Sequence, residues 1–202
     1  YLKKLSKKND TSVCIFTTGI TSRKKHKNNE IKELKKNALK AFRILGFKKN
    51  FFLDLDDNKL DNYPLLKIVK TIEGIISKEK PNIIFTHFPD DLNIDHKIVT
   101  EAVLTAARPL KKNKYLHKIF FYETLSSTEW SINEKFLPNT YIDIKDTIKF
   151  KLKAIKCYKS ELRAFPHPRS LKGIEILAQK RGSEVSLKFA EAFMLFRDVS
   201  KI

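Results

Sequence analysis

The chain has 202 residues, of which 42% are hydrophobic and 32% are charged, a composition typical of a folded domain with a substantial core. No apolar run approaches the length that crosses a bilayer, and no apolar core of a signal peptide is present. Cys14 and Cys157 are too few for a disulfide framework, so we expect reduced thiols in a cytoplasmic protein.

The formal net charge of +18 at pH 7 raises the question of a nucleic-acid partner. The lysines are spread along the whole chain, mostly on the polar faces of predicted helices, and no platform of interleaved aromatic and arginine residues is present. We interpret the charge as a solvated lysine-rich surface and expect no nucleic-acid partner. The charge would still favour anionic partners through long-range attraction.

The first half of the chain alternates between two periodicities. After Leu2 and Leu5, which are typical of the end of a helix, three segments have the pattern of buried strands: 13–17, 50–55 and 83–86. Helical stripes follow them at 31–45, where Gly46 would be the C-cap glycine, 64–76 and 98–106. This alternation predicts a single α/β domain over residues 1–202, a Rossmann-like three-layer sandwich with a mainly parallel sheet. Loops 18–23, 55–62 and 87–96 should then meet at one rim.

The second half is less regular. Strands are predicted at 117–122 and 139–144, helices at 148–162 and 171–181, and either a strand or a helix at 189–196. Between the two helices, the run from Phe165 to Arg169 contains two prolines and predicts a rigid turn.

One stretch, residues 81–96, gathers most of the polar chemistry. A short apolar strand ends at Thr86, a polar loop that begins with His87 and is rich in aspartate follows, and His96 falls in the first turn of the next helix. A strand, a polar loop and a helix N-terminus form the layout by which α/β proteins place chemistry at the carboxyl edge of a sheet. Imidazole and carboxylate groups together are also the ligand chemistry of zinc.

Five motifs occur in an order that points to a known family. They are Thr18-Gly19 with Ser22-Arg23, Thr86-His87 with Asp91-Leu92-Asn93-Ile94-Asp95-His96, Ser126 to Trp130, Phe165 to Ser170, and Arg181-Gly182-Ser183. Together they resemble the PIG-L/LmbE family of zinc-dependent N-deacetylases over nearly all 202 residues. The resemblance implies Zn²⁺ as cofactor and an N-acetylglucosamine-type sugar or glycoconjugate as substrate.

By this resemblance, His96 is a zinc ligand, although a histidine at a helix start can also be a capping or core residue. Asp95 holds the position of an acidic residue that orients neighbouring polar groups, and it could equally cap the helix. Asn93 falls where several relatives carry a histidine that stabilises the oxyanion. Its amide can donate a hydrogen bond but no proton, so its catalytic role would be electrostatic only.

Five further residues are candidates for binding the substrate: Arg23, His87, Asp91, His167 and Arg169. The guanidinium fork of Arg23 suits a phosphate or sugar hydroxyls, yet its basic surroundings also suit an ordinary surface cation. His87 can also be a satisfied loop histidine. His167 and Arg169 can line the substrate entrance or simply belong to the rigid turn.

The sequence departs from the family pattern at its start. The family's first strand ends in a His-Pro-Asp-Asp-Glu motif, which supplies two zinc ligands and a general base, and this chain begins at Tyr1 without it. We therefore expect a truncated fold without its first strand, and residues 1–202 alone to bind zinc weakly and deacetylate nothing measurable. The alternative is a non-catalytic basic module that binds sugar or nucleic acid and has lost its metal site. Assembly into a homo-oligomer stays open.

Overall fold

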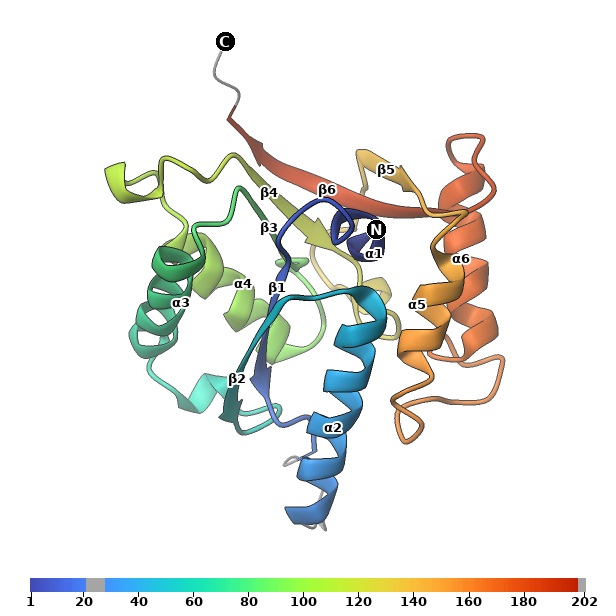
Figure 1. Ribbon diagram of the computed structural model, residues 1–202, viewed down its shortest axis with the longest axis horizontal. Coiled ribbons are helices and arrows are strands. Elements are labelled where there is room, and N and C mark those ends of the chain that lie inside the picture. The colour runs from blue at the N-terminus through green and yellow to red at the C-terminus, as the bar shows by residue number, and fades with distance from the viewer. Residues whose placement is uncertain (21–27, 200–202) are drawn as a thin grey trace. The chain divides into compact units, whose positions relative to one another are not determined.

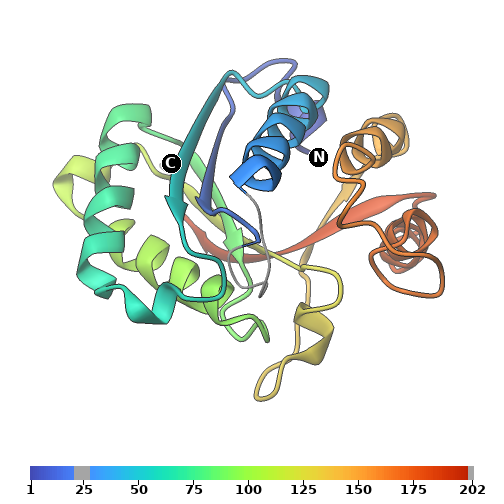
Figure 2. The same ribbon diagram turned by 90° about the horizontal axis from the view of Figure 1, so that it is seen from below.

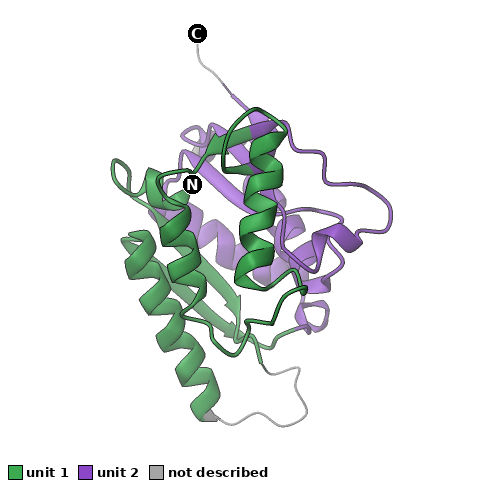
Figure 3. Ribbon diagram, turned by 90° about the vertical axis from the view of Figure 1, so that its right-hand side faces the viewer, with its two compact units in different colours: residues 1–57, 141–191 green, residues 58–140, 192–202 purple. Residues whose placement is uncertain are grey.

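The structure, a computed structural model, describes residues 1–20 and 28–199. They divide into two compact units, drawn in different colours in Figure 3. Unit 1 contains residues 1–57 and 141–191, and unit 2 contains residues 58–140 and 192–202. That residues 1–202 form a single domain stays a prediction. Within the described ranges, no helix has the length and apolar character needed to cross a membrane.

Unit 1 is built on two parallel strands with helices packed beside one another (Figure 1). Its elements are α1 (Leu2–Leu5), β1 (Ser12–Thr17), α2 (Asn28–Leu45), β2 (Lys49–Leu55), α5 (Ile148–Ile155) and α6 (Leu171–Ser183). β1 pairs with β2 from Ser12 opposite Lys49 to Thr17 opposite Leu55. Helix α2 packs on α5, and α5 packs on α6. Ile144, Ala178 and Phe189 form a buried cluster of this unit.

Helix α2 ends where the sequence predicts. Gly46 has a φ of +88°, and its N–H donates to the carbonyl of Phe42, which is the geometry of a C-cap glycine. A side chain here would also collide with Ser6, because an added Cβ would lie 2.5 Å from its Oγ. The glycine therefore both stops α2 and allows α1 to approach.

Unit 2 places two helices beside a pair of parallel strands, and Figure 2 shows α3 and α4 side by side. Its elements are η1 (Leu60–Asn62), α3 (Leu65–Glu79), β3 (Ile83–His87), α4 (Ile94–Ala106), η2 (Lys111–Asn113), β4 (Lys118–Tyr122) and η3 (Thr128–Trp130). β3 and β4 pair in register from Ile83 opposite Lys118 to His87 opposite Tyr122. The rings of Phe85 and Phe120 stack at 5.2 Å on this sheet.

Two strands carry the chain across the unit boundary: β5 (Thr140–Asp143) and β6 (Ala190–Asp198). The second sheet has the strand order β3-β4-β6-β5, and β6 runs antiparallel to β4. The apolar segment 189–196, predicted as a strand or a helix, is thus a strand.

The α/β class and the parallel pairs β1–β2 and β3–β4 are confirmed, but the prediction of one mainly parallel Rossmann-like sheet is not. The described strands form a two-stranded parallel sheet and a four-stranded mixed sheet. The predicted helix 148–162 also ends early, at Ile155. There the chain tightens into turns, because Cys157 and Tyr158 donate to carbonyls only three residues back.

Candidate functional site

The polar loop between β3 and α4 is fixed by a helix cap. Asn93 is the N-cap of α4, and its side-chain oxygen accepts the N–H groups of Asp95 at 2.8 Å and His96 at 3.4 Å. The expectation that His96 lies in the first turn of a helix is confirmed. The capping that was considered for Asp95 is performed by Asn93, two residues earlier. The cap holds the backbone of His96 in place at the end of β3.

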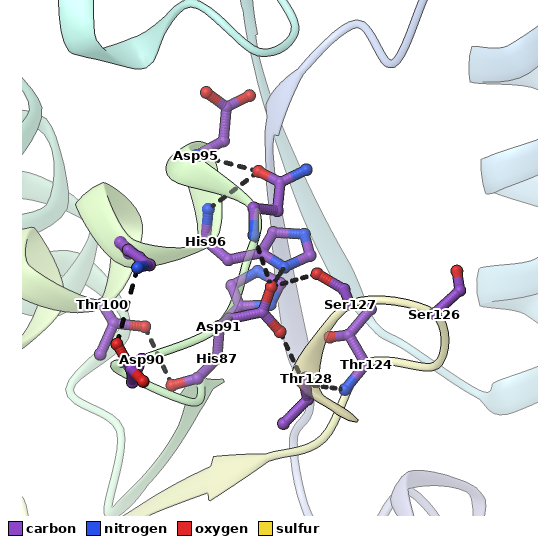
Figure 4. A network of polar contacts seen from close by, with 12 residues as sticks. His87, Asp90, Asp91, Asp95, His96, Thr100, Thr124, Ser126, Ser127 and Thr128 are labelled. Carbon is purple, nitrogen blue, oxygen red and sulfur yellow. Dashed lines mark hydrogen bonds and ion pairs between the residues drawn. The ribbon is translucent and has the colours of Figure 1, made fainter. Parts of the chain in front are cut away.

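The Asp91 carboxylate organises the site (Figure 4). It is completely buried, and its Oδ1 lies 2.9 Å from His96 Nδ1 and 2.9 Å from the backbone N of Asn93. The hydroxyl of Ser127 donates to Oδ1, and that of Thr128 donates to Oδ2 at 2.6 Å. Its oxygens are engaged by protein groups, and one of them holds His96. The predicted role of Asp91 in binding substrate stays a prediction.

These contacts decide the protonation of the pair. Burial alone would raise the pKa of Asp91, but the hydrogen bonds from His96, Ser127 and Thr128 outweigh it and hold the pKa well below its usual range. Asp91 is therefore an ionised acceptor, and His96 Nδ1 must carry the proton it donates. In the tautomer that carries a single proton, on Nδ1, the lone pair of His96 lies on Nε2. This is the tautomer in which a histidine binds a metal through Nε2.

His87 lies flat against His96. The two rings are 3.9 Å apart and within 5° of parallel, and the Tyr122 hydroxyl lies 3.2 Å from His87 Nε2. Burial, followed by electrostatic repulsion from the adjacent His96 ring, lowers the pKa of His87 to about 3, so the His87 ring is neutral at physiological pH. Its Nδ1 is a buried atom with no hydrogen-bond partner in the part of the chain that the structure describes. The structure thus places His87 under the His96 ring, while its predicted role in binding substrate stays a prediction.

Asp95 ties a second loop to the start of α4. Its carboxylate is buried and accepts the N–H of Asn58 at 2.6 Å and that of Leu60 at 3.0 Å. Asn93 Nδ2 also donates to Asn58 Oδ1 at 3.1 Å. Residues 58–60 and 93–96 therefore meet within unit 2, as expected for two of the three loops predicted to share one rim. This geometry gives Asp95 and Asn93 structural contacts, and their catalytic roles stay predictions.

Asp90 fixes the long loop after β4. Its carboxylate accepts the backbone N–H of Asn133 at 2.7 Å and of Glu134 at 2.8 Å, and it pairs with Lys97 at 3.6 Å. The hydrogen bond from Glu134, with those from Asn133, lowers the pKa of Asp90 to about 2. Adjacent carboxylates thus have separate tasks: Asp90 holds a loop, and Asp91 holds an imidazole.

Two of the other predicted residues are described, both in the other unit. His167 and Arg169 belong to unit 1, where the Arg169 N–H donates to His167 Nδ1 at 3.0 Å and its guanidinium lies 3.8 Å from Glu161. These contacts fit the predicted rigid turn. Arg23 lies outside the described residues. The structure therefore brings together His87, Asp91, Asn93, Asp95 and His96 and leaves the remaining candidates in the other unit or undescribed.

The described residues of the site provide only part of a zinc-binding site. The Asp91–His96 pair is the carboxylate–histidine arrangement that orients a zinc ligand. A catalytic zinc site normally takes three protein ligands, and no group of three His, Cys, Asp or Glu side chains within residues 1–20 and 28–199 is placed to hold a metal. Among these residues, the site offers one well-oriented imidazole, His96.

Comparison with known families identifies the chain. Residues 1–107, more than half of its length, match the PIG-L family model, described as GlcNAc-PI de-N-acetylase. The chain belongs to the PIG-L family. It is therefore a member of a family of zinc-dependent deacetylases, as its motifs predict.

Solved structures share the PIG-L fold. A conserved protein of Thermus thermophilus matches with a TM-score of 0.75 and 21% identity, covering 100% of this chain and 88% of that one. The N,N'-diacetylchitobiose deacetylase of Pyrococcus horikoshii matches with a TM-score of 0.75 and 20% identity, covering 97% of this chain and 76% of that one. The 4-carboxy-2-hydroxymuconate hydratase of Pseudomonas putida matches with a TM-score of 0.75 and 16% identity, covering 100% of this chain and 92% of that one. At these identities the likeness shows the fold alone, and the fold hosts more than one reaction.

Sequence reasoning missed three residues of the site. Ser127 and Thr128 lie in a motif that supports the family resemblance, but nothing local indicates that their hydroxyls reach back to Asp91. Tyr122, whose hydroxyl meets His87, looks from its pattern like an ordinary strand residue. The signal that could have suggested the first two was their position in a polar loop directly after a buried strand.

Proposed function

We propose that this protein acts in the zinc-dependent removal of an N-acetyl group from an N-acetylglucosamine-type sugar or glycoconjugate. Family membership supports the reaction class, and the PIG-L family description and the diacetylchitobiose deacetylase support an acetylated amino sugar as substrate. The observation that carries the proposal is the buried Asp91 carboxylate 2.9 Å from His96 Nδ1, which leaves Nε2 free to bind zinc.

In this proposal His96 is one metal ligand, and the described residues around it keep it in position. Bound zinc would polarise the acetyl carbonyl and lower the pKa of its water ligand. Asp91 keeps the proton on His96 Nδ1, Ser127 and Thr128 keep Asp91 ionised, and the Asn93 cap fixes the backbone. His87 supports the ring of His96 from one side.

The substrate contacts proposed are those of Arg23, His87, Asp91, His167 and Arg169. The side-chain oxygen of Asn93 caps the helix, and its side-chain nitrogen donates to Asn58 Oδ1. Any electrostatic role of Asn93 toward an oxyanion would therefore have to use the remaining N–H of that amide.

The test uses two measurements that can fail separately. Zinc affinity, measured by competition with a chromophoric chelator, should fall sharply in His96→Ala and by roughly 10- to 100-fold in Asp91→Asn. Amine release from an N-acetylglucosaminyl substrate, measured on a protein in which this chain is joined to the family's first strand and its His-Pro-Asp-Asp-Glu motif, should disappear in His96→Ala. His117→Ala is the matched control, since His117 contacts the Val199 carbonyl outside the site. If His96→Ala binds zinc as tightly as the parent protein, His96 is no ligand and the proposal fails.

A further inference from the structure

Unit 1 contains a cavity between the β1–β2 pair and helix α2, and Figure 2 shows this helix beside the two strands. The volume of the cavity is about 230 Å³. All the residues that line it belong to unit 1, whereas Asp91 and His96 belong to unit 2. The cavity therefore shares no residue with the site around His96.

The inner walls of the cavity are apolar. Helix α2 lines it with Ile31, Leu34 and Ala38, whose spacing of three and four residues places them on one face of the helix. The strands contribute Ile15 and Phe52, which are partners across the β1–β2 pair. An engineered cavity of roughly 150 Å³ with walls of this kind holds benzene. The cavity of unit 1 therefore has room for one ring with a small substituent.

The mouth of the cavity is polar. The Lys35 ammonium lies 3.1 Å from the Asp54 carboxylate and 4.6 Å from the centre of the Phe52 ring. The side chains of Lys35 and Asp54 are 42% and 57% exposed, so this ion pair lies where the cavity opens to solvent. Tyr158 and Glu161 add a hydroxyl and a carboxylate to the lining. Burial raises the pKa of Tyr158 to about 12, so its hydroxyl keeps its proton and can donate it in a hydrogen bond.

The backbone of β2 is irregular at the same place. Ile15 pairs with Phe52 and Thr17 pairs with Leu55, so the chain advances two residues on β1 and three on β2. One extra residue in a strand is the mark of a β-bulge, a feature that is frequent beside functional sites because it re-aims a side chain. Asp54 lies in this stretch with a φ of +53°, which is uncommon for a residue other than glycine. The re-aimed side chain is the one that meets Lys35 at the mouth.

We infer that this cavity binds a neutral molecule with a single aromatic ring and one hydroxyl group, with the ring against the apolar walls and the hydroxyl at the mouth. A hydroxyl both donates and accepts, so it can bond a carboxylate oxygen and the Tyr158 hydroxyl while Lys35 and Asp54 stay paired. A charged ligand of either sign would have to break that pair or lie beside a like charge.

The same walls argue against a sugar in this cavity. A sugar ring carries hydroxyls on several sides, and those turned toward Ile15, Leu34 and Ala38 would lose their hydrogen bonds to water without gaining protein partners. The ligand class inferred for the cavity is therefore different from the acetylated amino sugar proposed as substrate. The inference does not depend on the proposed deacetylase activity.

Phenol is the probe for this site. In two-dimensional ¹H–¹⁵N NMR spectra of the whole 202-residue chain, phenol should shift the amide signals of Ile15, Leu34 and Phe52 along one saturation curve. A ligand of this size should give a dissociation constant of about 1 mM or lower. Benzoate and benzylammonium carry the same ring with a negative or a positive charge, and each should bind at least roughly tenfold more weakly than phenol.

Two variants test where phenol binds. Ala38→Leu fills the cavity and should abolish the saturable shifts at residues 15, 34 and 52. Tyr158→Phe removes only the hydroxyl at the mouth and should weaken binding by about two- to tenfold. The matched control is Tyr141→Phe, in the same unit but outside the lining, which should bind phenol as the parent chain does.

Circular dichroism establishes that each variant is folded. If Ala38→Leu does not fold, the comparison of Tyr158→Phe with Tyr141→Phe decides the question. Unchanged affinity in Tyr158→Phe, equal loss in Tyr141→Phe, or tighter binding of either charged ring would overturn the inference. Shifts that spread over the chain without saturation would overturn it as well, because phenol would then adsorb to apolar surface without a defined site.

Discussion

At the scale of the residue, Asp91 has the most consequential surroundings in the site. Its carboxylate, buried without access to water, accepts hydrogen bonds from two side-chain hydroxyls, one backbone N–H and one imidazole. A buried charge is tolerable when its lone pairs are satisfied, and removing it leaves every donor without a partner. The same contacts that ionise the group therefore make it hard to replace.

We expect Asp91→Ala to lower the free energy of unfolding by about 3–5 kcal/mol, because four donors lose their acceptor in a buried site. Urea denaturation followed by circular dichroism measures the change. The control is Asp61→Ala, in the exposed η1 turn, which should stay within about 0.5 kcal/mol of the parent chain. Similar values for the two variants would show that the Asp91 network contributes little.

Cys14 gives a second prediction at this scale. Burial raises the pKa of its thiol to about 12, so almost none of the Cys14 thiol is ionised near neutral pH in the folded chain. In a Cys157→Ser background, alkylation by iodoacetamide at about pH 8 should be at least roughly a hundredfold slower in the folded chain than in urea. Mass spectrometry over time measures the two rates. Equal rates would mean that the β1 thiol is open to reagent.

At the scale of the element, the start of α4 shows how a helix end serves a site. The Asn93 oxygen takes two N–H groups that the first turn cannot pair by itself, and one of them belongs to His96. The cap therefore stabilises the helix and fixes the backbone of the proposed zinc ligand at once.

Asn93→Ala should lower the free energy of unfolding by about 1 kcal/mol and also weaken zinc binding, because the turn that carries His96 frays. Ser170→Ala is the matched control, since Ser170 caps α6 by accepting the Gly173 N–H at 2.9 Å. It should cost similar stability and leave zinc affinity unchanged. A chelator competition assay on both variants separates the effects. Equal zinc affinities would confine Asn93 to a purely structural role.

The elements also show which parts of the structure local sequence could predict. The apolar spacing after His96 predicts α4, and Gly46 predicts the end of α2, because both signals lie within one or two helical turns. The direction of β6, by contrast, could not be predicted from local sequence. Its apolar pattern fits any buried strand, and its antiparallel pairing with β4 depends on the path of the chain through α6. The partners of Asp91 were hidden for the same reason, since Ser127 and Thr128 are 36 and 37 residues away.

At the scale of the whole molecule, an excess of cations governs the response to acid. The chain carries 41 Lys and Arg against 23 Asp and Glu. Each carboxylate that gains a proton raises an already high positive charge, which increases self-repulsion in the compact state. We therefore expect acid to destabilise the fold early, and added salt to restore part of the loss by screening.

Glu191 should account for a measurable part of the stability that the fold loses in acid. Burial alone would raise its pKa, but the ammonium of Lys151, which donates a hydrogen bond to Glu191 at 2.5 Å, outweighs it and lowers the pKa to about 2. In the unfolded chain the pKa of a glutamate is about 4.3. A carboxylate whose pKa is lower in the folded state stabilises the fold at pH values above about 4.3, and this stabilisation disappears as the pH falls toward 2. Glu191→Gln should therefore cost about 2–3 kcal/mol at pH 7 and almost nothing near pH 2.

Urea unfolding measured from about pH 7 to pH 2 gives both curves, which should converge on the acid side as Glu191 in the parent chain takes up its proton. Glu101→Gln, at an exposed position of α4, controls for the loss of one negative charge and should run parallel to the parent curve. If the Glu191→Gln curve also runs parallel to the parent curve over the whole range, the pairing with Lys151 does not lower this pKa. The acid sensitivity of the molecule would then arise from its general charge alone.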